Sequence, residues 1–305
     1  MAFDSPGFSP APPTAVAVRW RLRDAELDLS VPRIMAICNV TPDSFSDGGK
    51  HHSVDSALRF AEAAIEDGAS IVDVGGESTR PGNTPVSVAT ELARVVPVVE
   101  SIRRRFPELL LSVDTVKSAV AEAVLSVGVH AINDVSAGRL DERMFAVVAS
   151  ARAGLVLMHS RGAVTEMATY ALATYDDDPM AAVCAELGFQ ASAARAAGVP
   201  ASAMVLDPGL GFSKTTAQSL SVLHHLERLS ALGYPVLVGA SRKRFVGEIT
   251  GVASPAHRTV GSVVAHVLAV QRGARILRTH DVAATREALA VMAEFAVGGL
   301  ESATR

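Results

Sequence analysis

Polar residues that could do chemistry follow short apolar runs at eight places along this chain of 305 residues. Asp, Asn and Ser also cap helices, so any one of these residues could serve only as a cap. Eight coincident caps explain the pattern less well than one shared site does. The residues are Asn39, Asp73, Glu77, Asp114, Asn133, Asp134, His159, Asp207, Ser241, Arg242, Lys243, Arg278, His280 and Asp281.

The chemistry of these residues divides into two halves. Carboxylate and amide groups suit a planar heterocycle, because a carboxylate facing two parallel N–H donors makes strong paired hydrogen bonds. Cationic groups suit phosphates. The first half contains Asp114, Asn133 and Asp207, and the second contains Arg80, Lys243, Arg278 and His280. Together they predict a ligand with a heterocyclic head and an anionic tail, bound in a largely apolar mouth.

Short apolar runs that alternate with longer helical patterns must position these groups. The expected strands cover residues 33–39, 70–75, 109–114, 130–135, 154–159, 203–208, 235–240 and 274–279. Several of the intervening helices end in glycine, which is typical of a left-handed cap. The pattern predicts an α/β protein with the TIM (β/α)8 barrel fold, in which all strand ends meet at one mouth. The alternative is an open doubly wound sheet, which usually has fewer strands.

Composition limits the class of protein. With 49% hydrophobic residues and a mean hydropathy of +0.28, the chain can fill a large core. A net charge of −4 argues against binding of nucleic acid, and no apolar run approaches the roughly 20 residues of a membrane span. Two cysteines are too few for a disulfide framework, which fits a reducing, cytoplasmic location.

We expect a flexible N-terminal tail and lead-in segment (1–30), one catalytic barrel (31–297) and a C-terminal tail (298–305).

Three further features of the sequence do not indicate a site. The segment DPGLGFSKTT (207–216) is similar to a phosphate loop, but Ser213 stands where a Walker loop requires glycine before Lys214. His266 lies in an apolar helical stretch and is interpreted as a packing histidine. The segment from Arg161 to Asp178 contains no motif and is expected to be a long loop.

Eight segments, in order, resemble those of the dihydropteroate synthase family, the folate-pathway enzymes that sulfonamide drugs inhibit. They span nearly the whole chain from about residue 31 to residue 295. The segments are MAICNVTPDSFSDGG (35–49), DVGGESTRPG (73–82), SVDT (112–115), INDV (132–135), LMH (157–159), LDPGLGF (206–212), GASRKRFVG (239–247) and RTHDV (278–282). So many motifs in family order are highly specific.

The resemblance implies a pterin-binding TIM barrel that condenses 6-hydroxymethyl-7,8-dihydropterin pyrophosphate with 4-aminobenzoate. The products would be 7,8-dihydropteroate and pyrophosphate, with Mg²⁺ as cofactor and a homodimer as the usual assembly. Helices late in the barrel would form the dimer contact. The implied partners are these small molecules and a second copy of the chain.

The resemblance also implies a role for each site residue. Asp114, Asn133, Asp207 and Lys243 would hold the pterin, with Met158 and Phe212 against its ring. Arg278 and His280 would hold the pyrophosphate, and Asn39 would contact Mg²⁺. Phe45, Thr79, Arg80 and Pro81 would build the aminobenzoate pocket on two loops, while Arg244 stands where many members have serine and could pair with the aminobenzoate carboxylate.

Two alternatives share the pterin site. A methyltetrahydrofolate:corrinoid methyltransferase has the same type of barrel but does not need the Asn39 loop or the anion site of Arg278 and His280. A non-catalytic synthase paralogue would bind pterin without coupling it, although the chain keeps the TRPG, SRK and RTHD segments intact. The favoured reaction is a dissociative substitution at the pterin methylene. In it, Asp114 and Asp207 stabilise positive charge on the ring.

Overall fold

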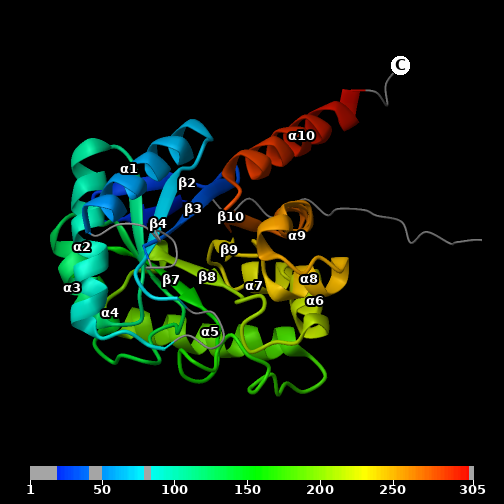
Figure 1. Ribbon diagram of the computed structural model, residues 1–305. Helices are drawn as coiled ribbons and strands as arrows, with labels where there is room; N and C mark the ends of the chain where they lie inside the picture. The colour runs from blue at the N-terminus through cyan, green and yellow to red at the C-terminus, as the bar shows by residue number, and fades with distance from the viewer. Residues whose placement is uncertain (1–18, 41–49, 79–83, 302–305) are drawn as a thin grey trace, which may run out of the picture.

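The computed structural model describes residues 19–40, 50–78 and 84–301 and forms a closed barrel of eight parallel strands (Figure 1). The strand order is β10-β3-β4-β5-β6-β7-β8-β9, so each strand pairs with the next along the chain and the last pairs with the first. The strands are β3 (Arg33–Asn39), β4 (Ile71–Gly75), β5 (Leu110–Asp114), β6 (Ala131–Asp134), β7 (Gly154–Met158), β8 (Met204–Asp207), β9 (Val236–Val238) and β10 (Ala274–Thr279). The predicted (β/α)8 barrel is confirmed, and the open sheet is excluded.

Helices surround the barrel on its outside (Figure 1). The apolar pattern over residues 216–232 predicts one helix, but the structure divides this range into α6 and α7. The pattern does not predict α8, which spans only two turns. The predicted glycine turns are confirmed, since Gly68, Gly128, Gly198, Gly233 and Gly273 all have positive φ. The helices are α1 (Lys50–Glu66), α2 (Val88–Arg105), α3 (Ser118–Ser126), α4 (Met144–Ala151), α5 (Pro179–Ala196), α6 (Thr216–His224), α7 (Glu227–Ser230), α8 (Arg244–Thr250), α9 (Thr259–Gln271) and α10 (Val282–Glu301), with 3-10 turns η2 (Ala201–Ala203) and η3 (Pro255–His257).

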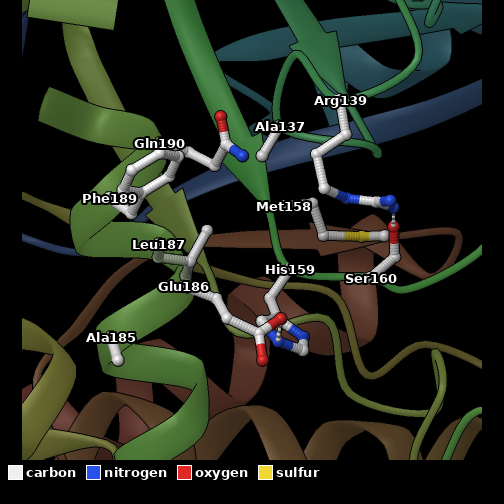
Figure 2. A pocket seen from close by; sticks show the side chains of 10 residues that line it. All are labelled: Ala137, Arg139, Met158, His159, Ser160, Ala185, Glu186, Leu187, Phe189 and Gln190. Carbon is white, nitrogen blue, oxygen red and sulfur yellow. Dashed lines mark hydrogen bonds and ion pairs between the residues drawn. The ribbon is translucent and has the colours of Figure 1, made fainter. Parts of the chain in front are cut away.

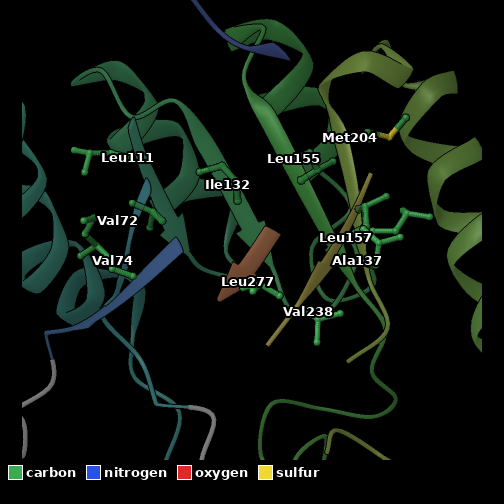
Figure 3. Close-up of a cluster of buried hydrophobic side chains, with 14 of the residues drawn as sticks. Val72, Val74, Leu111, Ile132, Ala137, Leu155, Leu157, Met204, Val238 and Leu277 are labelled. Carbon is green, nitrogen blue, oxygen red and sulfur yellow. The ribbon is translucent and has the colours of Figure 1, made fainter. Parts of the chain in front are cut away.

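Two apolar layers hold this arrangement together. Outward-facing strand residues such as Val72, Leu111 and Leu155 are buried beneath the helices (Figure 3). Alternate residues such as Ile71 and Val156 fill the inside of the barrel. Side chains of a strand point alternately to its two faces, so the apolar runs reflect burial on both sides.

A hairpin of β1 (Arg19–Leu22) and β2 (Ala25–Asp28) lies within the segment expected to lead into the barrel. Trp20 is completely buried in the inner cluster, and its indole N–H donates to the carbonyl of Ala203 at 2.9 Å. A Cβ on Gly154 would lie only 2.6 Å from Leu22, so glycine is needed where the hairpin meets β7.

At the other end of the chain, α10 continues to Glu301. Among the helices in the described ranges, none combines the length and apolar character needed to cross a bilayer.

Candidate active site

Polar and charged side chains occupy the last inward-facing positions of most barrel strands. Within β4, Ile71 packs inside the barrel and Val72 packs under the helices, so Asp73 faces inward. The same alternation applies to the other strands. It brings Asn39, Asp73, Asp114, Asn133, Met158, Asp207 and Arg278 to one mouth at the C-terminal ends of the strands.

An arginine bridges two acids across this mouth. Arg278 on β10 donates from Nε to Asp73 Oδ2 at 2.7 Å and from Nη2 to Asp114 Oδ2 at 2.9 Å. Burial raises the pKa of Asp114 to about 7, and the nearby Arg278 charge opposes that rise. The site therefore holds an arginine whose charge is balanced by acids before any ligand arrives.

Asp73 is a functional candidate that sequence reasoning missed. Its position at a strand end was noted, but no motif assigned it a role. It is fully buried, and its Oδ2 also accepts a hydrogen bond from Asn133 Nδ2 at 3.0 Å. Only the three-dimensional pairing with Arg278, from the opposite end of the chain, reveals its place in the site.

Two buried acceptors in this network lack partners among the described residues. They are Asp73 Oδ1 and Asn133 Oδ1. Leaving a buried acceptor unpaired costs on the order of 1–3 kcal/mol, so native proteins rarely tolerate it without a reason. Both atoms are suited to accept N–H groups from a ligand in the mouth.

Asp207 and Lys243 are two further ionisable groups of the mouth, and each influences the charge of the other. Asp207 Oδ1 accepts from the Gly209 N–H at 2.7 Å, and Lys243 Nζ donates to the carbonyl of Leu210 at 2.7 Å. Burial raises the pKa of Asp207 and lowers the pKa of Lys243 to about 7, while each charge opposes the shift of the other. Lys243 Nζ also lies 3.9 Å from the ring centroid of Phe212, as a cation–π contact.

The loops after β9 and β10 are joined beside Arg278. His280 Nδ1 lies 3.0 Å from Ser241 Oγ, which also accepts from the His280 backbone N–H at 3.1 Å. Next to them, Arg242 and Asp281 form an ion pair at 2.6 Å. These contacts hold His280 against the loop after β9, directly after the strand that carries Arg278.

Apolar side chains form one wall of the mouth. Met158 at the end of β7 packs with Val116, Val135 and Met167, and Phe212 lies against this cluster. A flat ring could therefore meet an apolar surface while the polar groups described above contact its edges.

Two of the strand-end residues face away from the mouth. Asp134 accepts from the backbone N–H groups of Ser136 and Gly138, as the cap of its own loop. His159 faces α5, where its Nε2 lies 3.1 Å from Glu186 Oε2. Asp134 therefore caps the turn that follows its strand and not a helix, because α4 begins only at Met144.

Arg244 begins α8 and contacts the segment that has no sequence motif. Its guanidinium lies 3.6 Å from the ring centroid of Tyr170, and its Nε lies 3.8 Å from Glu248 Oε1. Its Nη2 is buried and has no hydrogen-bond partner within the described chain. The structure thus gives Arg244 a stacking partner that the sequence did not indicate, and the N–H groups of its Nη2 are unpaired among the described residues.

Comparison with known proteins identifies the family. The model of the pterin binding enzyme family matches residues 35–280. A dihydropteroate synthase from Streptococcus pyogenes serotype M6 is 44% identical over 262 residues, covering 86% of this chain and 94% of that protein. The chain belongs to the dihydropteroate synthase family.

Solved structures of dihydropteroate synthases have the same fold. The Xanthomonas albilineans enzyme with 4-aminobenzoic acid has a TM-score of 0.85 and 46% identity, covering 92% of this chain and 98% of that chain. The same enzyme in complex with 7,8-dihydropteroate has a TM-score of 0.81 and 44% identity, covering 90% and 98%. The structural likeness therefore extends over nearly the whole of both chains.

Four residues that the family resemblance assigned to the aminobenzoate loops lie outside the described residues. They are Phe45, Thr79, Arg80 and Pro81. The described residues that flank the second loop are tied together, because Glu77 Oε1 accepts from the Val86 N–H at 2.7 Å. Lys117 donates to the other oxygen of Glu77 at 2.8 Å.

The Mg²⁺ expected for the family can be tested against the residues present. Asn39 ends β3 half-buried in the mouth, and a Cβ on neighbouring Gly75 would lie 3.6 Å from its Oδ1. In the described ranges no cluster of three His, Cys, Asp or Glu residues could hold a metal. Mg²⁺ commonly takes one or two protein oxygens and completes its shell with water and phosphate. The Asn39 amide oxygen fits such a site.

Proposed function

We propose that this protein is a transferase that joins 6-hydroxymethyl-7,8-dihydropterin pyrophosphate to 4-aminobenzoate, forming 7,8-dihydropteroate and pyrophosphate in folate biosynthesis. The observation that carries the proposal is the single mouth in which Asp73 and Asn133 present free acceptors beside the cationic Arg278. One ligand with a hydrogen-bonding ring and an anionic tail would satisfy both halves. The related Xanthomonas albilineans enzyme was solved in complex with 7,8-dihydropteroate.

The pterin would bind through its N–H edge. A carboxylate facing two parallel N–H groups makes paired, charge-assisted hydrogen bonds, and Asp207 is the acid suited to this role. Asn133 Oδ1 offers a further acceptor, and Met158 and Phe212 offer apolar contact to the ring face. The charged form of Lys243 favours the ionised form of Asp207, and the ionised form of Asp207 favours the charged form of Lys243.

The reaction would proceed by loss of pyrophosphate followed by attack of the amine. The C–O bond at the pterin methylene breaks, and its electrons leave with the pyrophosphate, whose charge Arg278 and His280 stabilise. Asp114 and Asp207 stabilise positive charge on the ring. The neutral aniline nitrogen then bonds to the methylene carbon and releases one proton to water. When bound, Mg²⁺ supplies charge neutralisation to the pyrophosphate, and Asn39 is the described residue that would hold it.

One assay tests the proposed reaction against its alternatives. Purified protein is mixed with the pterin pyrophosphate, Mg²⁺ and 4-aminobenzoate, and both pyrophosphate and dihydropteroate are measured. We expect equal amounts of the two products, formed only when aminobenzoate is present. Pterin binding without products would instead identify a non-catalytic paralogue. Methyl transfer to a corrinoid protein would identify the methyltransferase.

Replacing Asp207 by asparagine should weaken pterin binding and slow turnover together. The amide keeps the size of the side chain but removes the charge that pairs with the N–H edge and balances the ring. We expect kcat/KM for the pterin pyrophosphate to fall at least about 100-fold. The exposed acid Asp178, changed to asparagine, serves as the control and should retain full activity. Wild-type turnover by Asp207→Asn would contradict the assigned role.

An exposed apolar face on the late helices supports the proposal of a homodimer. Val260, Val264 and Leu268 follow one another at four-residue spacing on α9 and are 78%, 52% and 42% exposed. α10 packs beside α9 and exposes Val291 and Phe295. A second copy of the chain would cover this face, because an apolar patch of this kind usually marks a protein contact.

A charge placed in this face should separate the dimer. We expect Val264→Glu to elute as a monomer in size-exclusion chromatography with light scattering at concentrations where the wild type elutes as a dimer. Leu220, which is 43% exposed on α6, gives the matched control. A wild type that elutes as a monomer, or a Val264→Glu variant that remains a dimer, would exclude this interface.

The two cysteines support the proposed cytoplasmic location. Cys38 and Cys184 are both free thiols, and Cys38 is buried at the end of β3. Burial raises the pKa of Cys38 to about 12, so its thiol is unreactive near neutral pH. Free thiols of this kind are typical of proteins in a reducing compartment.

A further inference from the structure

A completely buried lysine lies behind the pterin mouth. Lys214 follows the loop after β8 and has no exposed surface. Lysine is almost never fully buried unless its charge is paired, because removing an ammonium group from water costs several kcal/mol. The segment 207–216, which is similar to a phosphate loop but lacks its glycine, therefore contains a lysine whose burial needs an explanation.

All three N–H groups of the Lys214 ammonium have acceptors. Nζ lies 2.8 Å from His159 Nδ1 and donates to the carbonyls of Gly209 and Phe212, each at 3.2 Å. A neutral amine has only two N–H groups, so the three acceptors match the ammonium form. The lysine thus ties the end of β7 to two points of the loop formed by residues 208–213.

This loop positions groups already placed in the mouth. The Gly209 N–H donates to Asp207, the Leu210 carbonyl accepts from Lys243, and the Phe212 ring lies against the Lys243 ammonium. The loop also contains tight backbone geometry, because a Cβ on Gly209 would lie 1.9 Å from the His159 carbonyl oxygen. Holding the Gly209 and Phe212 carbonyls therefore fixes the contacts of both Asp207 and Lys243.

The protonation state of His159 is set by the same contacts. Burial and the nearby Lys214 lower the pKa of His159 to about 4, so its ring is neutral at pH 7. Because Nδ1 accepts from Lys214, the ring proton is on Nε2, which faces Glu186 (Figure 2). Glu186 also pairs with Arg161. Hydrogen bonds from His159 and Arg161 outweigh partial burial and lower the pKa of Glu186 to about 2.

We propose that Lys214 is a positioning residue for pterin binding, acting through the loop of residues 208–213 to orient Asp207 and Lys243. The inference rests on the proposed function, because it assigns the pterin to this mouth. The lysine has no exposed surface, so its effect on the ligand is indirect. His159, which follows β7, contacts the lysine directly, and Glu186 on α5 holds the other ring nitrogen of His159. The same pair lines a cavity of about 270 Å³ beside the site (Figure 2).

The charges around Lys214 agree with a role in the mouth. Burial lowers its pKa to about 7, and Lys243 and Arg161 act in the same direction. Asp207 and Glu186 favour the ammonium, and the ring of Tyr175 lies 5.8 Å from Nζ. The positive charge of Lys214 in turn favours the ionised form of Asp207.

The test compares Lys214→Met with Lys214→Gln, which keeps two N–H donors without the charge. Calorimetric titration of the full chain with the pterin pyrophosphate should show weaker binding in the order wild type, Lys214→Gln, Lys214→Met. The methionine variant should bind at least about tenfold more weakly. The KM for 4-aminobenzoate should stay within about twofold, because the ring-positioning contacts involve only the pterin side.

A chemical rescue separates positioning from general stability. Lys214→Ala removes a propylammonium group, so added propylammonium chloride should restore pterin binding severalfold, whereas tetramethylammonium chloride at equal ionic strength should not. His130→Gln provides the matched control at the opposite end of the barrel, since His130 is also buried and accepts from a backbone N–H at 3.0 Å. It should lower stability without changing pterin affinity.

Each outcome decides the proposal. The proposal is wrong if the Lys214→Met and Lys214→Gln variants fold and bind the pterin with wild-type affinity. It is also wrong if neither variant folds, because Lys214 would then be needed for folding. If the wild type binds the pterin pyrophosphate but does not join it to 4-aminobenzoate, the proposed reaction is wrong. The effect of Lys214 on pterin binding can still be measured in that case. If the wild type does not bind the pterin at all, both the proposed function and the proposed role of Lys214 are wrong.

Discussion

Replacing Arg278 by methionine is expected to cause the largest loss of activity of any single change in the described mouth. Arg278 is the group that would stabilise the departing pyrophosphate, and it also separates Asp73 from Asp114. Removing a donor aimed at developing negative charge costs on the order of 10²–10³ in rate, and here the full charge is removed as well. We therefore expect kcat/KM for the pterin pyrophosphate to fall at least about 10³-fold.

The same change should destabilise the fold. Arg278 and Asp114 have side chains only 18% and 16% exposed, and Asp73 is fully buried. Breaking a buried ion pair by removing one partner typically costs about 3–5 kcal/mol, because the remaining charge stays buried without compensation. Urea unfolding should show this loss. It should become smaller as pH falls and the stranded acids take up protons.

A nearby arginine on the same strand provides the control. Arg275 lies three residues earlier on β10, at the opposite end of the barrel, where its Nη1 donates to the Ser30 carbonyl at 3.5 Å. Arg275→Met should leave both kcat/KM and the unfolding free energy nearly unchanged, within about 0.5 kcal/mol. Equal effects of the two substitutions would contradict the special role of Arg278.

Acid should destabilise the protein through its buried histidines. Burial lowers the pKa values of His130, His159 and His266 to about 4, from the ordinary value of 6.5. Between pH 6.5 and pH 4 the folded state keeps these rings neutral while the unfolded chain binds protons. The unfolded state therefore gains protons as pH falls, and the unfolding free energy decreases by roughly 4 kcal/mol per pH unit from the three rings together.

Buried acids act in the opposite direction over the same range. Burial raises the pKa values of Asp114, Asp134 and Asp207, so the folded state binds protons there before the unfolded chain does. The net pH dependence of the wild type is therefore smaller than that of the histidines alone. A single-residue comparison isolates the histidine contribution.

His266 is the best residue for that comparison because it lies on α9, away from the mouth. Its Nε2 accepts from the Ala240 N–H at 3.3 Å, and protonation of that nitrogen would break the contact. The stability advantage of the wild type over His266→Gln should shrink by roughly 3 kcal/mol between pH 7 and pH 4. Urea unfolding at several pH values measures it. A constant difference would show that His266 is not held neutral.

The sequence predicts the barrel well because the signals that define it are local. Apolar runs specify the strands, and glycines mark turns that lead from a helix back to the next strand. The expected starts of all eight strands lie within one residue of those observed. The hairpin that carries Trp20 was not expected, because four alternating residues are too few to distinguish from a loop. The break between α6 and α7 lies inside a continuous helical pattern, so periodicity alone does not reveal it.

The site is less predictable because it depends on contacts across the barrel. Strand ends indicate which residues reach the mouth, but the partner of Arg278 depends on the stagger of strands far apart in sequence. The same is true of Lys214, whose acceptors come from His159 and from its own loop. It is also true of Arg244, whose stacking partner Tyr170 lies in a segment without a motif.

Opposite ends of one ligand would occupy the two halves of the mouth, and a pair of ligands that differ only in the pyrophosphate can show this. Calorimetry would compare the pterin pyrophosphate with 6-hydroxymethyl-7,8-dihydropterin, which lacks the pyrophosphate, on wild type, Asp207→Asn and His280→Gln. We predict that Asp207→Asn weakens both ligands, whereas His280→Gln weakens only the pyrophosphate. Equal weakening of both ligands by both variants, or of neither ligand by Asp207→Asn, would contradict the account.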